Sequence, residues 1–454
     1  MIFIRNRRFG LLWTSTLLSN LGNWLMIVAV PVYVYTMTGS TLSSGFAFVA
    51  QTLPAIVFAP LAGVLADRWD RRAVMVGADL LRMVIVLALI VVDDPGMLWL
   101  LYTAMFFESA IGNFFQPAAR AVVPAVVGRG GDLEAANAWN TVAGGIVRLA
   151  GAPLGGALYA LVGFDGLVLI DSATYLLSAV LIFGMGPLRV ADNGRQPDTS
   201  SWLAAFWEQV REGLAFLSRH SVLRATLIVS SLFLSANAAL NVLLVPYVID
   251  VLGGDASDVG ILMAALGGGF LASAYVGNVL SRSGLLRLSF TGCLAAITLC
   301  FAGLFLIHHF VAALVFIALA GLPGGALLML VQVQVQRQTP DRQLGRVGSA
   351  FSAAEMAATV VGASAGSVAG QQLPLTTTVW LVIGVSAASA VLAAALLPTR
   401  PGPAAAGPEA AAEPAMAKPV TMAERHSLRV LPPPQPECRH NAGLATQTAC
   451  RPTP

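Results

Sequence analysis

Charge is scarce in this chain. Only 11% of its 454 residues are Asp, Glu, Lys or Arg, whereas 57% are hydrophobic, and the mean hydropathy is +0.76. Soluble globular domains carry about 25% charged residues, so this composition excludes an ordinary soluble protein and predicts a polytopic membrane protein in a lipid bilayer. With so few Lys and Arg, no basic cluster lies on a soluble domain, and we expect no nucleic-acid partner.

Cysteine and nucleotide-binding motifs are also lacking. The four cysteines, Cys293, Cys300, Cys438 and Cys450, include no C-x-x-C pair, so neither a metal site nor a disulfide is expected. The chain contains no G-x-x-x-x-G-K-[ST] loop and no visible nucleophile constellation. We therefore expect no enzyme activity and no cofactor, and ATP-driven transport would need a separate subunit.

Long apolar runs fill most of the sequence and predict twelve membrane spans. The first, from Phe9 to about Thr36, is too long for the apolar core of a signal peptide and is interpreted as a retained span. Of the 26 Lys and Arg residues, all but Arg82 and Arg148 lie at the N-terminus, in alternate loops or in the C-terminal tail. The loops between these carry no Lys or Arg, and their charged residues are all Asp. Because basic loops stay in the cytoplasm, both termini are predicted cytoplasmic, in a multi-pass protein of the inner (plasma) membrane.

An internal repeat divides the spans into two sets. Gly63-x-x-x-Asp67-Arg68 recurs 214 residues later as Gly277-x-x-x-Ser281-Arg282, and the glycine pair 151 and 155 recurs at an offset of 215 as 366 and 370. Matches at an offset of about 215 residues indicate two halves of six spans in parallel repeat.

The predicted organisation therefore has four parts. Residues 1–186 form an N-terminal half and residues 224–397 a C-terminal half. Residues 187–223 form a cytoplasmic linker, whose helical spacing of apolar side chains indicates an interfacial amphipathic helix. Residues 398–454, rich in Ala, Pro and Gly, are predicted to be a disordered cytoplasmic tail.

The loop after the second span concentrates charge in the run Gly63-Val-Leu-Ala-Asp67-Arg68-Trp-Asp70-Arg71-Arg72. We interpret it as a tight cytoplasmic turn. Gly63 would allow close helix approach, Asp67 would stabilise a helix N-terminus, and the arginines would pair with the acids or with lipid phosphate. The alternative is that these arginines only fix the membrane topology.

This run, G-x-x-x-D-R-x-x-R-R, resembles the signature of loop 2/3 in the major facilitator superfamily. The resemblance implies an all-α fold of twelve transmembrane helices in two pseudo-symmetric halves around one central site. It also implies that Gly63, Asp67, Arg68, Asp70, Arg71 and Arg72 form a conformational latch. Many members carry glycine where Asp70 stands, a departure shared by the branch that resembles macrolide efflux proteins and enterobactin and other siderophore exporters.

A second motif points to the same branch. The run Gly151-Ala-Pro153-Leu-Gly155-Gly156 is similar to the exporter signature G-P-x-x-G-G in the fifth span, with the proline displaced by one position. The resemblance implies that this motif lets span 5 slide on a helix of the other half.

Ionisable side chains inside spans each cost at least ~2.5 kcal/mol and are therefore candidates for function. Asp79 and Arg82, three residues apart, are expected to pair with each other or with the charged loop and to have a structural role. The proton-coupling candidates are Glu108, Arg148, Asp171 and Glu355. The alternatives are that Glu108 is satisfied by Arg148 or by neighbouring amides, and that Asp171 and Glu355 pair inside the bundle.

Uncharged polar side chains recur at similar depth in both halves. The repeat offset of 215 carries Asn20 and Asn23 of span 1 to positions 235 and 238, close to the asparagine pair Asn237 and Asn241 on span 7. With Trp24 and Phe107, they are the candidates for a substrate cavity suited to an amphipathic organic molecule rather than an inorganic ion. The alternative for each aromatic residue is lipid contact or packing.

Together these patterns predict a monomeric secondary transporter that works by alternating access. The favoured function is efflux of an amphipathic small molecule, such as a drug, a macrolide or a siderophore, by an antiporter of the multidrug-resistance type. Protons are the expected coupling ion, with sodium as the alternative. Two other functions stay open: an importer or lysolipid flippase on the same fold, and a transport-inactive scaffold or sensor.

Overall fold

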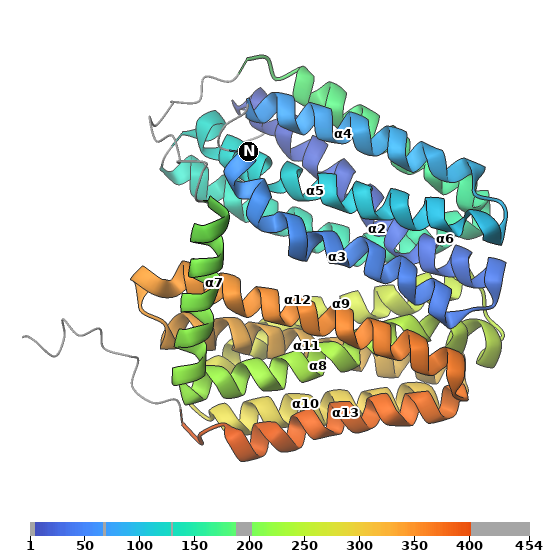
Figure 1. Cartoon of the computed structure of the whole chain (residues 1–454), viewed down its shortest axis with the longest axis vertical. Coiled ribbons are helices and arrows are strands. Elements are labelled where there is room, and N and C mark those ends of the chain that lie inside the picture. Colours follow the sequence, from blue (N-terminus) through green and yellow to red (C-terminus); the bar gives the residue numbers. More distant parts are fainter. Residues whose placement is uncertain (1–4, 67–69, 129, 188–201, 401–454) are drawn as a thin grey trace, which may run out of the picture. The chain divides into compact units, whose positions relative to one another are not determined.

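The computed structural model describes residues 5–66, 70–128, 130–187 and 202–400. Within these ranges the chain is helical and contains no strand, which confirms the predicted all-α class. The described helices belong to one compact unit, Met1–Ala405 (Figure 1).

The first six predicted spans form a set of helices that pack mainly on one another. They are α2 (Arg7–Thr38), α3 (Thr41–Ala66), α4 (Arg71–Leu87) with its 3-10 extension η1 (Ala88–Val91), a short turn η2 (Pro95–Met97), α5 (Leu98–Val127) and α6 (Gly131–Phe183). The long helix α6 includes both the fifth and the sixth spans. Its backbone breaks at Gly163, where φ is 71° and ψ is −173°, a left-handed φ that favours glycine. A single glycine therefore separates the fifth span from the sixth, where a connecting loop would be expected.

The last six spans form the second set. They are α8 (Ser221–Pro246) with a π-helical turn η3 (Tyr247–Val251), α9 (Ala256–Arg282), α10 (Leu286–Leu306), α11 (Phe310–Gln338), α12 (Asp341–Gln372) and α13 (Leu375–Leu396). Among the described residues, eight helices are individually long and apolar enough to cross a membrane. The two sets together account for the twelve predicted spans, arranged in two halves.

Helix α7 (Trp202–Arg219) lies between the two sets in the sequence and crosses α12 at one end of the bundle (Figure 1). Gly213 packs against the backbone of Arg346, and Glu212 forms an ion pair with Arg346. A helix is thus present in the predicted linker, while its place at a membrane interface stays a prediction.

The start of α4 is held by a side chain that the sequence analysis assigned differently. Asp70 is the N-cap of α4, and its Oδ1 accepts hydrogen bonds from the backbone N–H groups of Arg72 (2.8 Å) and Ala73 (3.3 Å). The predicted capping acid, Asp67, lies outside the described residues. Arg72 in turn donates to the carbonyls of Ile182 (3.2 Å) and Phe183 at the end of α6, where a cation complements the helix dipole.

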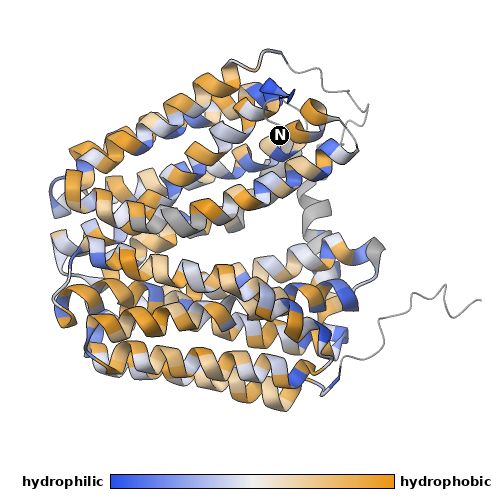
Figure 2. Cartoon of the chain, turned by 180° about the vertical axis from the view of Figure 1, so that it is seen from behind, coloured by the Kyte–Doolittle hydropathy of each residue, from blue (hydrophilic) through white to orange (hydrophobic). Residues whose placement is uncertain are grey.

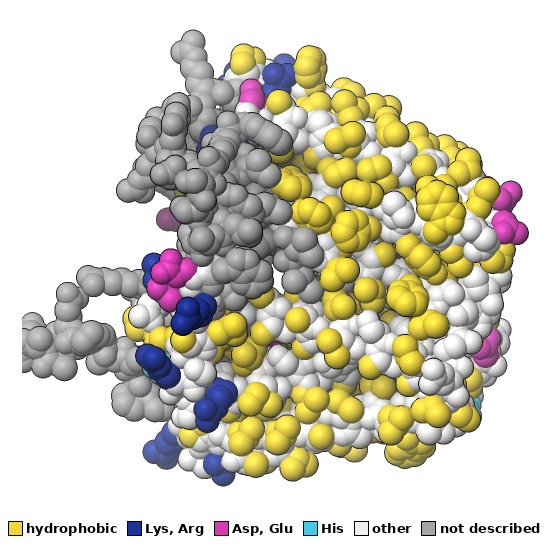
Figure 3. Space-filling model, viewed as in Figure 1, with side chains coloured by type: hydrophobic (Ala, Val, Ile, Leu, Met, Phe, Trp, Pro, Cys, Tyr) yellow, Lys and Arg dark blue, Asp and Glu magenta, His cyan; other side chains and the backbone are white. Residues whose placement is uncertain are grey.

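The distribution of side chains is that of a membrane protein. Large apolar side chains such as Leu161, Phe183 and Leu299 are 79%, 68% and 71% exposed, whereas Asp79 and Asp171 are buried. Hydrophobic residues run along the helices in Figure 2, and hydrophobic side chains are spread widely over the part of the face in Figure 3 that is not grey. Burying charge and exposing hydrocarbon is favourable only where lipid surrounds the chain.

Charged side chains gather at two opposite ends of the helices (Figure 3). The arginine-rich end carries the exposed residues Arg120, Arg282, Arg337 and Arg346, and the acidic end carries the exposed residues Asp93, Asp94, Asp165, Asp250 and Asp255. The side of the membrane that each end faces stays a prediction.

The two halves contact each other closely near the acidic end. A Cβ atom added to Gly156 of α6 would lie 2.7 Å from the Cα of Gly260 in α9, so only glycine permits this backbone contact. Gly45 of α3 lies beside Ser367 of α12, and Ser40 donates a hydrogen bond of 2.9 Å to Gln371. Backbones at such short range pack through van der Waals contact and need small residues.

Within the second half, two adjacent glycines on α9 allow a test of this packing. A Cβ atom on Gly269 would lie 2.1 Å from the carbonyl oxygen of Ala318 in α11, whereas one on Gly268 would meet nothing within 4 Å. We expect Gly269→Ala to destabilise the protein by about 1–3 kcal/mol through overpacking. The control Gly268→Ala should be neutral or stabilise it by up to ~1 kcal/mol, because alanine favours a helix. Thermal unfolding in detergent measures both, and equal melting temperatures for the two variants would contradict this packing.

Candidate functional site

Arg82 of α4 occupies the centre of a buried polar cluster, and its side chain is only 3% exposed. Its Nε donates a hydrogen bond of 2.9 Å to Oε1 of Glu108 on α5, and Nη2 donates to the same oxygen. Nη2 also donates to Oδ1 of Asn23 on α2, and Nη1 donates to the Ser19 hydroxyl at 3.3 Å. One guanidinium thus connects three helices.

Tyr175 of α6 closes the other side of this cluster. Its hydroxyl lies within hydrogen-bond distance of Oε1 of Glu108 (2.8 Å) and of Oδ1 of Asn23. The Arg82 guanidinium lies 4.3 Å from the centre of the Tyr175 ring, in cation–π geometry. Gly112 makes room on α5, since a Cβ atom there would lie 3.4 Å from the guanidinium.

Asp79 is the partner that the sequence analysis expected for Arg82, but their ion pair is long. Nη1 of Arg82 lies 3.9 Å from Oδ1 of Asp79, and Oδ2 of Asp79 instead accepts a 2.5 Å hydrogen bond from Ser178. The expected ion pair between Asp79 and Arg82 is therefore present, but Arg82 also has a closer acidic partner, Glu108, which the sequence analysis did not assign to it. Glu108 is nearer because α5 packs directly on α4. The alternative partner proposed for Glu108, Arg148, has a side chain outside the described part of the chain.

Asp171 of α6 is a second acid in the same place, and it is only 1% exposed. Its Oδ1 accepts a hydrogen bond from Thr174 (3.3 Å), whereas its Oδ2 has no hydrogen-bond partner among the described residues. Gly22 allows this carboxylate to lie against α2, since a Cβ atom on Gly22 would be 2.0 Å from Oδ1 of Asp171.

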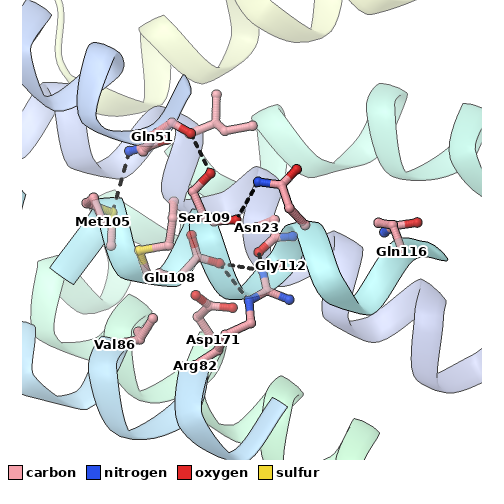
Figure 4. A pocket seen from close by; sticks show the side chains of 13 residues that line it. Asn23, Gln51, Arg82, Val86, Met105, Glu108, Ser109, Gly112, Gln116 and Asp171 are labelled. Carbon is pink, nitrogen blue, oxygen red and sulfur yellow. Dashed lines mark hydrogen bonds and ion pairs between the residues drawn. The ribbon is translucent and has the colours of Figure 1, made fainter. Parts of the chain in front are cut away.

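A cavity of about 250 Å³ opens beside these groups, and we call it the acid cavity. It lies within the first half, and Figure 4 shows Arg82, Glu108 and Asp171 grouped on one side of it. Its lining residues are Asn23, Met26, Ile27, Gln51, Arg82, Val86, Met105, Glu108, Ser109, Gly112, Asn113, Gln116 and Asp171. The carboxyls of Glu108 and Asp171 and the guanidinium of Arg82 therefore line the same cavity. Asp79 contacts Arg82 but does not line the cavity.

A second cavity, of about 360 Å³, lies between the halves, and we call it the interhalf cavity. It is lined by residues of α2, α3, α8, α9 and α11: Trp24, Ile27, Val28, Pro31, Ser44, Phe48, Asn237, Asn241, Val242, Val245, Val259, Met263, Leu266, Gly267, Phe270 and Leu328. Asn237 and Asn241 are hydrogen-bonded to each other, with Nδ2 of Asn241 3.1 Å from Oδ1 of Asn237.

A third cavity, of about 400 Å³, lies among α2, α5 and α6 and reaches Arg120 near the arginine-rich end. Gln116 lines both this cavity and the acid cavity, and it donates a hydrogen bond of 3.1 Å to Oδ1 of Asn20. Trp24 lines both this cavity and the interhalf cavity.

The predicted substrate residues are thus divided among three cavities. Trp24, Asn237 and Asn241 line the interhalf cavity, Asn23 lines the acid cavity and Asn20 the third. Phe107 is 51% exposed and lines none of these three cavities, so its place in a substrate site stays a prediction.

Two further expectations are corrected by the tertiary contacts. Glu355 of α12 lies beside Ser230 of α8 in the second half, so it does not pair with Asp171. Among the described glycines of the span 5 motif, Gly156 meets the other half. Gly151 and Gly155 pack on α2, where added Cβ atoms would lie 2.5 Å from Cβ of Trp24 and 3.0 Å from the Leu25 carbonyl oxygen. The environment of Gly63 and the residues Asp67 and Arg68 lie outside the described part, as does the Pro153 side chain.

Sequence reasoning missed Arg82 and Tyr175 as members of the site. Arg82 was visible as a charge in an apolar run, but its spacing from Asp79 suggested a local ion pair. Tyr175 gave no signal, because a single tyrosine in a span is as well explained by packing.

Comparisons with known proteins agree with this architecture. The family model of the Major Facilitator Superfamily matches residues 12–351 and 227–434. The uncharacterised MFS-type transporter YfiS of Bacillus subtilis (strain 168) is 26% identical over 402 residues, which cover 87% of this chain and 92% of that protein. Macrolide efflux protein A of Streptococcus pyogenes is 24% identical, over 76% of this chain and 86% of its own length.

The fold also matches a solved structure. A bacterial homologue of the iron transporter ferroportin, in an inward-facing state, superposes with a TM-score of 0.62 over 86% of this chain and 97% of that chain, at 18% identity. Helix content, two six-span halves and a family match along most of the sequence lead to one conclusion. This chain belongs to the Major Facilitator Superfamily, and it is a membrane transporter rather than an enzyme.

Proposed function

We propose that this transporter exports an amphipathic small molecule in exchange for protons, by alternating access between its two halves. The acid cavity is the observation that carries this proposal. Asp79, Glu108 and Asp171 lie around a single guanidinium; Arg82 and the two aspartates are at most 3% exposed, and Glu108 is 14% exposed. With every carboxyl ionised, this membrane-embedded cluster would hold two uncompensated negative charges, which is costly in a low-dielectric site. Binding a proton relieves that cost.

The hydrogen bonds indicate which acid holds the proton. Glu108 accepts hydrogen bonds from Arg82 and Tyr175, which stabilise its carboxylate. Asp171 has one oxygen without any donor among the described residues, and an unpaired buried carboxylate is unfavourable as an anion. We therefore assign the proton to Asp171, and we assign Glu108 as the ionised partner of Arg82.

Helix α2 connects the proton site to the space between the halves. Asn23 accepts a hydrogen bond from Arg82, and the next residue, Trp24, lines the interhalf cavity. When Asp171 loses its proton, it competes with Glu108 for the Arg82 guanidinium. If Arg82 changes its partner from Glu108 to Asp171, its hydrogen bond to Asn23 moves α2. The protonation state of Asp171 thereby changes the α2 side of the interhalf cavity.

The contacts between the halves support a direction for the cycle. If the arginine-rich end faces the cytoplasm, as the distribution of basic residues predicts, the contacts at the acidic end close the outer side. The protein would then face inward, ready to load substrate from the cytoplasm of a cell whose plasma membrane it spans. The efflux activity in the name of one relative agrees with this direction.

The remaining sequence motifs take supporting roles in this proposal. We propose that residues 1–186 and 224–397 move as two bodies, joined by the linker 187–223, while the tail 398–454 extends into the cytoplasm. Asp70 and Arg72, which join the start of α4 to the end of α6, would stiffen the latch run Gly63–Arg72. Gly156 would be the sliding contact with the other half.

The assignment of the proton to Asp171 predicts different effects of two amide substitutions. In inverted vesicles with a pre-set pH gradient, a panel of amphipathic drugs and siderophores is added and proton movement is recorded. Asp171→Asn, whose side chain can neither take up nor release a proton, should reduce substrate-triggered proton movement to background. It should leave the melting temperature nearly unchanged.

Glu108→Gln should behave differently, because it leaves the buried Arg82 charge without its main partner. We expect a loss of about 3–5 kcal/mol of stability, seen as a lower melting temperature. Glu355→Gln is the matched control, as a carboxyl of the second half outside the acid cavity. Loss of coupling in this control but not in Asp171→Asn would overturn the assignment, and no proton movement in the wild type with any compound would contradict the proposed exchange.

Alternating access predicts that a covalent bond across the acidic end stops transport. In a variant whose native cysteines are replaced, Thr41→Cys and Gly370→Cys place their Cβ atoms about 3.5 Å apart, within disulfide range. Oxidation should reduce transport to background and a reductant should restore it. Each single-cysteine variant should be insensitive to oxidation. Full transport by a double variant shown to be cross-linked would mean that this contact stays closed throughout the cycle.

A further inference from the structure

Among the described residues, no charged side chain lines the interhalf cavity. All 16 lining residues are apolar, aromatic, amide or hydroxyl residues or glycine. Moving an unpaired ion from water into such a lining is strongly unfavourable. A ligand with a net charge would therefore find no counter-charge in this cavity.

The acids of the neighbouring cavity do not supply that counter-charge, because α2 separates the two spaces. Asn23 faces the acid cavity, whereas Trp24 faces the interhalf cavity. Ile27 is the one residue that lines both, and its side chain is apolar. Moreover, Glu108 of the acid cavity already accepts hydrogen bonds from Arg82 and Tyr175.

The polar groups that the cavity offers are those of an amide pair. Nδ2 of Asn241 donates to Oδ1 of Asn237 and to the Asn237 backbone carbonyl at 3.1 and 3.0 Å. This leaves the amide N–H groups of Asn237 and the amide oxygen of Asn241 without a hydrogen bond among the described residues. One donor and one acceptor, side by side, match a hydroxyl, carbonyl or amide group of a ligand.

We propose that the interhalf cavity binds an uncharged amphipathic molecule. Its hydrogen-bonding group contacts Asn237 and Asn241, and its apolar body packs against the aromatic side chains of Trp24, Phe48 and Phe270. The volume of about 360 Å³ lies within the usual range for small-molecule sites. This inference rests on the proposed exchange mechanism and names the substrate class for it.

The charge balance of the cycle follows from this substrate class. Exporting a neutral molecule while one proton enters moves one net positive charge inward, so the exchange is electrogenic. A cationic substrate exchanged for one proton would move no net charge. An inside-negative membrane potential therefore drives export even without a pH gradient, contributing about 2.3 kcal/mol per 100 mV for each charge.

Three probes test the proposal: 1-pyrenemethanol, 1-pyrenemethylammonium and 1-pyrenecarboxylate. They share the pyrene ring system and differ in one small polar group, which is neutral, cationic or anionic. The full-length protein is placed in nanodiscs, and saturable energy transfer from tryptophan to pyrene and the shift in melting temperature are measured. The alcohol should bind at least about tenfold more tightly than either ion, because the lining cannot compensate a charge. Asn241→Leu should weaken binding of the alcohol.

An isosteric substitution should create binding of an ionic probe that the wild type binds weakly. Asn241→Asp puts a carboxylate in the cavity, and the affinity for the ammonium probe should rise at least about tenfold relative to the wild type. Wild-type protein that binds an ionic probe as tightly as the alcohol would overturn the proposal. So would a wild type that binds no probe together with an Asn241→Asp variant that gains no ammonium binding.

These results are separable from a failure of proton coupling. Preferential binding of the alcohol by a protein that moves no protons in vesicles would reject the proposed exchange and retain the neutral cavity. Proton-coupled export of an ionic compound, with no preference for the alcohol, would retain the exchange and reject the neutral cavity.

Discussion

The ion pair between Arg82 and Glu108 is the interaction on which the first half depends. A guanidinium inside a membrane span needs compensation, and Arg82 obtains it from a carboxylate, an amide oxygen, a hydroxyl and the face of an aromatic ring. These partners come from α2, α5 and α6, so the position of each helix is tied to the same charged group. Gly112 matters because it leaves room for the guanidinium beside α5, and Gly22 matters because it lets Asp171 lie against α2.

The contacts within the first half differ in kind from the contacts between the halves. Within the first half, charged and polar groups hold four helices around the acid cavity. Between the halves, the contacts near the acidic end use small residues and backbone atoms, with few charges to break. Contacts of the second kind can separate and re-form at low cost, which alternating access requires. Helix α2 belongs to both sets, since Asn23 contacts Arg82 and Trp24 faces the other half.

Much of the fold could be predicted because the membrane constrains the sequence directly. Each span must be apolar, so its length is readable, and the alternation of arginine and aspartate between loops sets the number of crossings. The break at Gly163 was harder to predict in detail, since a single left-handed glycine replaces the expected loop. For the site, the rarity of charge in spans singled out Glu108 and Asp171. Their partners could not be predicted, because Arg82 lies 26 residues from Glu108 and a nearer acid, Asp79, competes for it in sequence.

The sequence by itself determined the fold class, the twelve spans, the repeat of two halves and the set of buried ionisable residues, because each follows from the cost of placing polar groups in hydrocarbon. Only the tertiary structure decided which acid pairs with Arg82, which acid keeps an unpaired oxygen, and which cavity each asparagine faces. Those outcomes depend on how helices rotate and approach one another, to within an ångström at Gly22, Gly112 and Gly156. Such rotations are set by packing between residues distant in the chain, which no local pattern records.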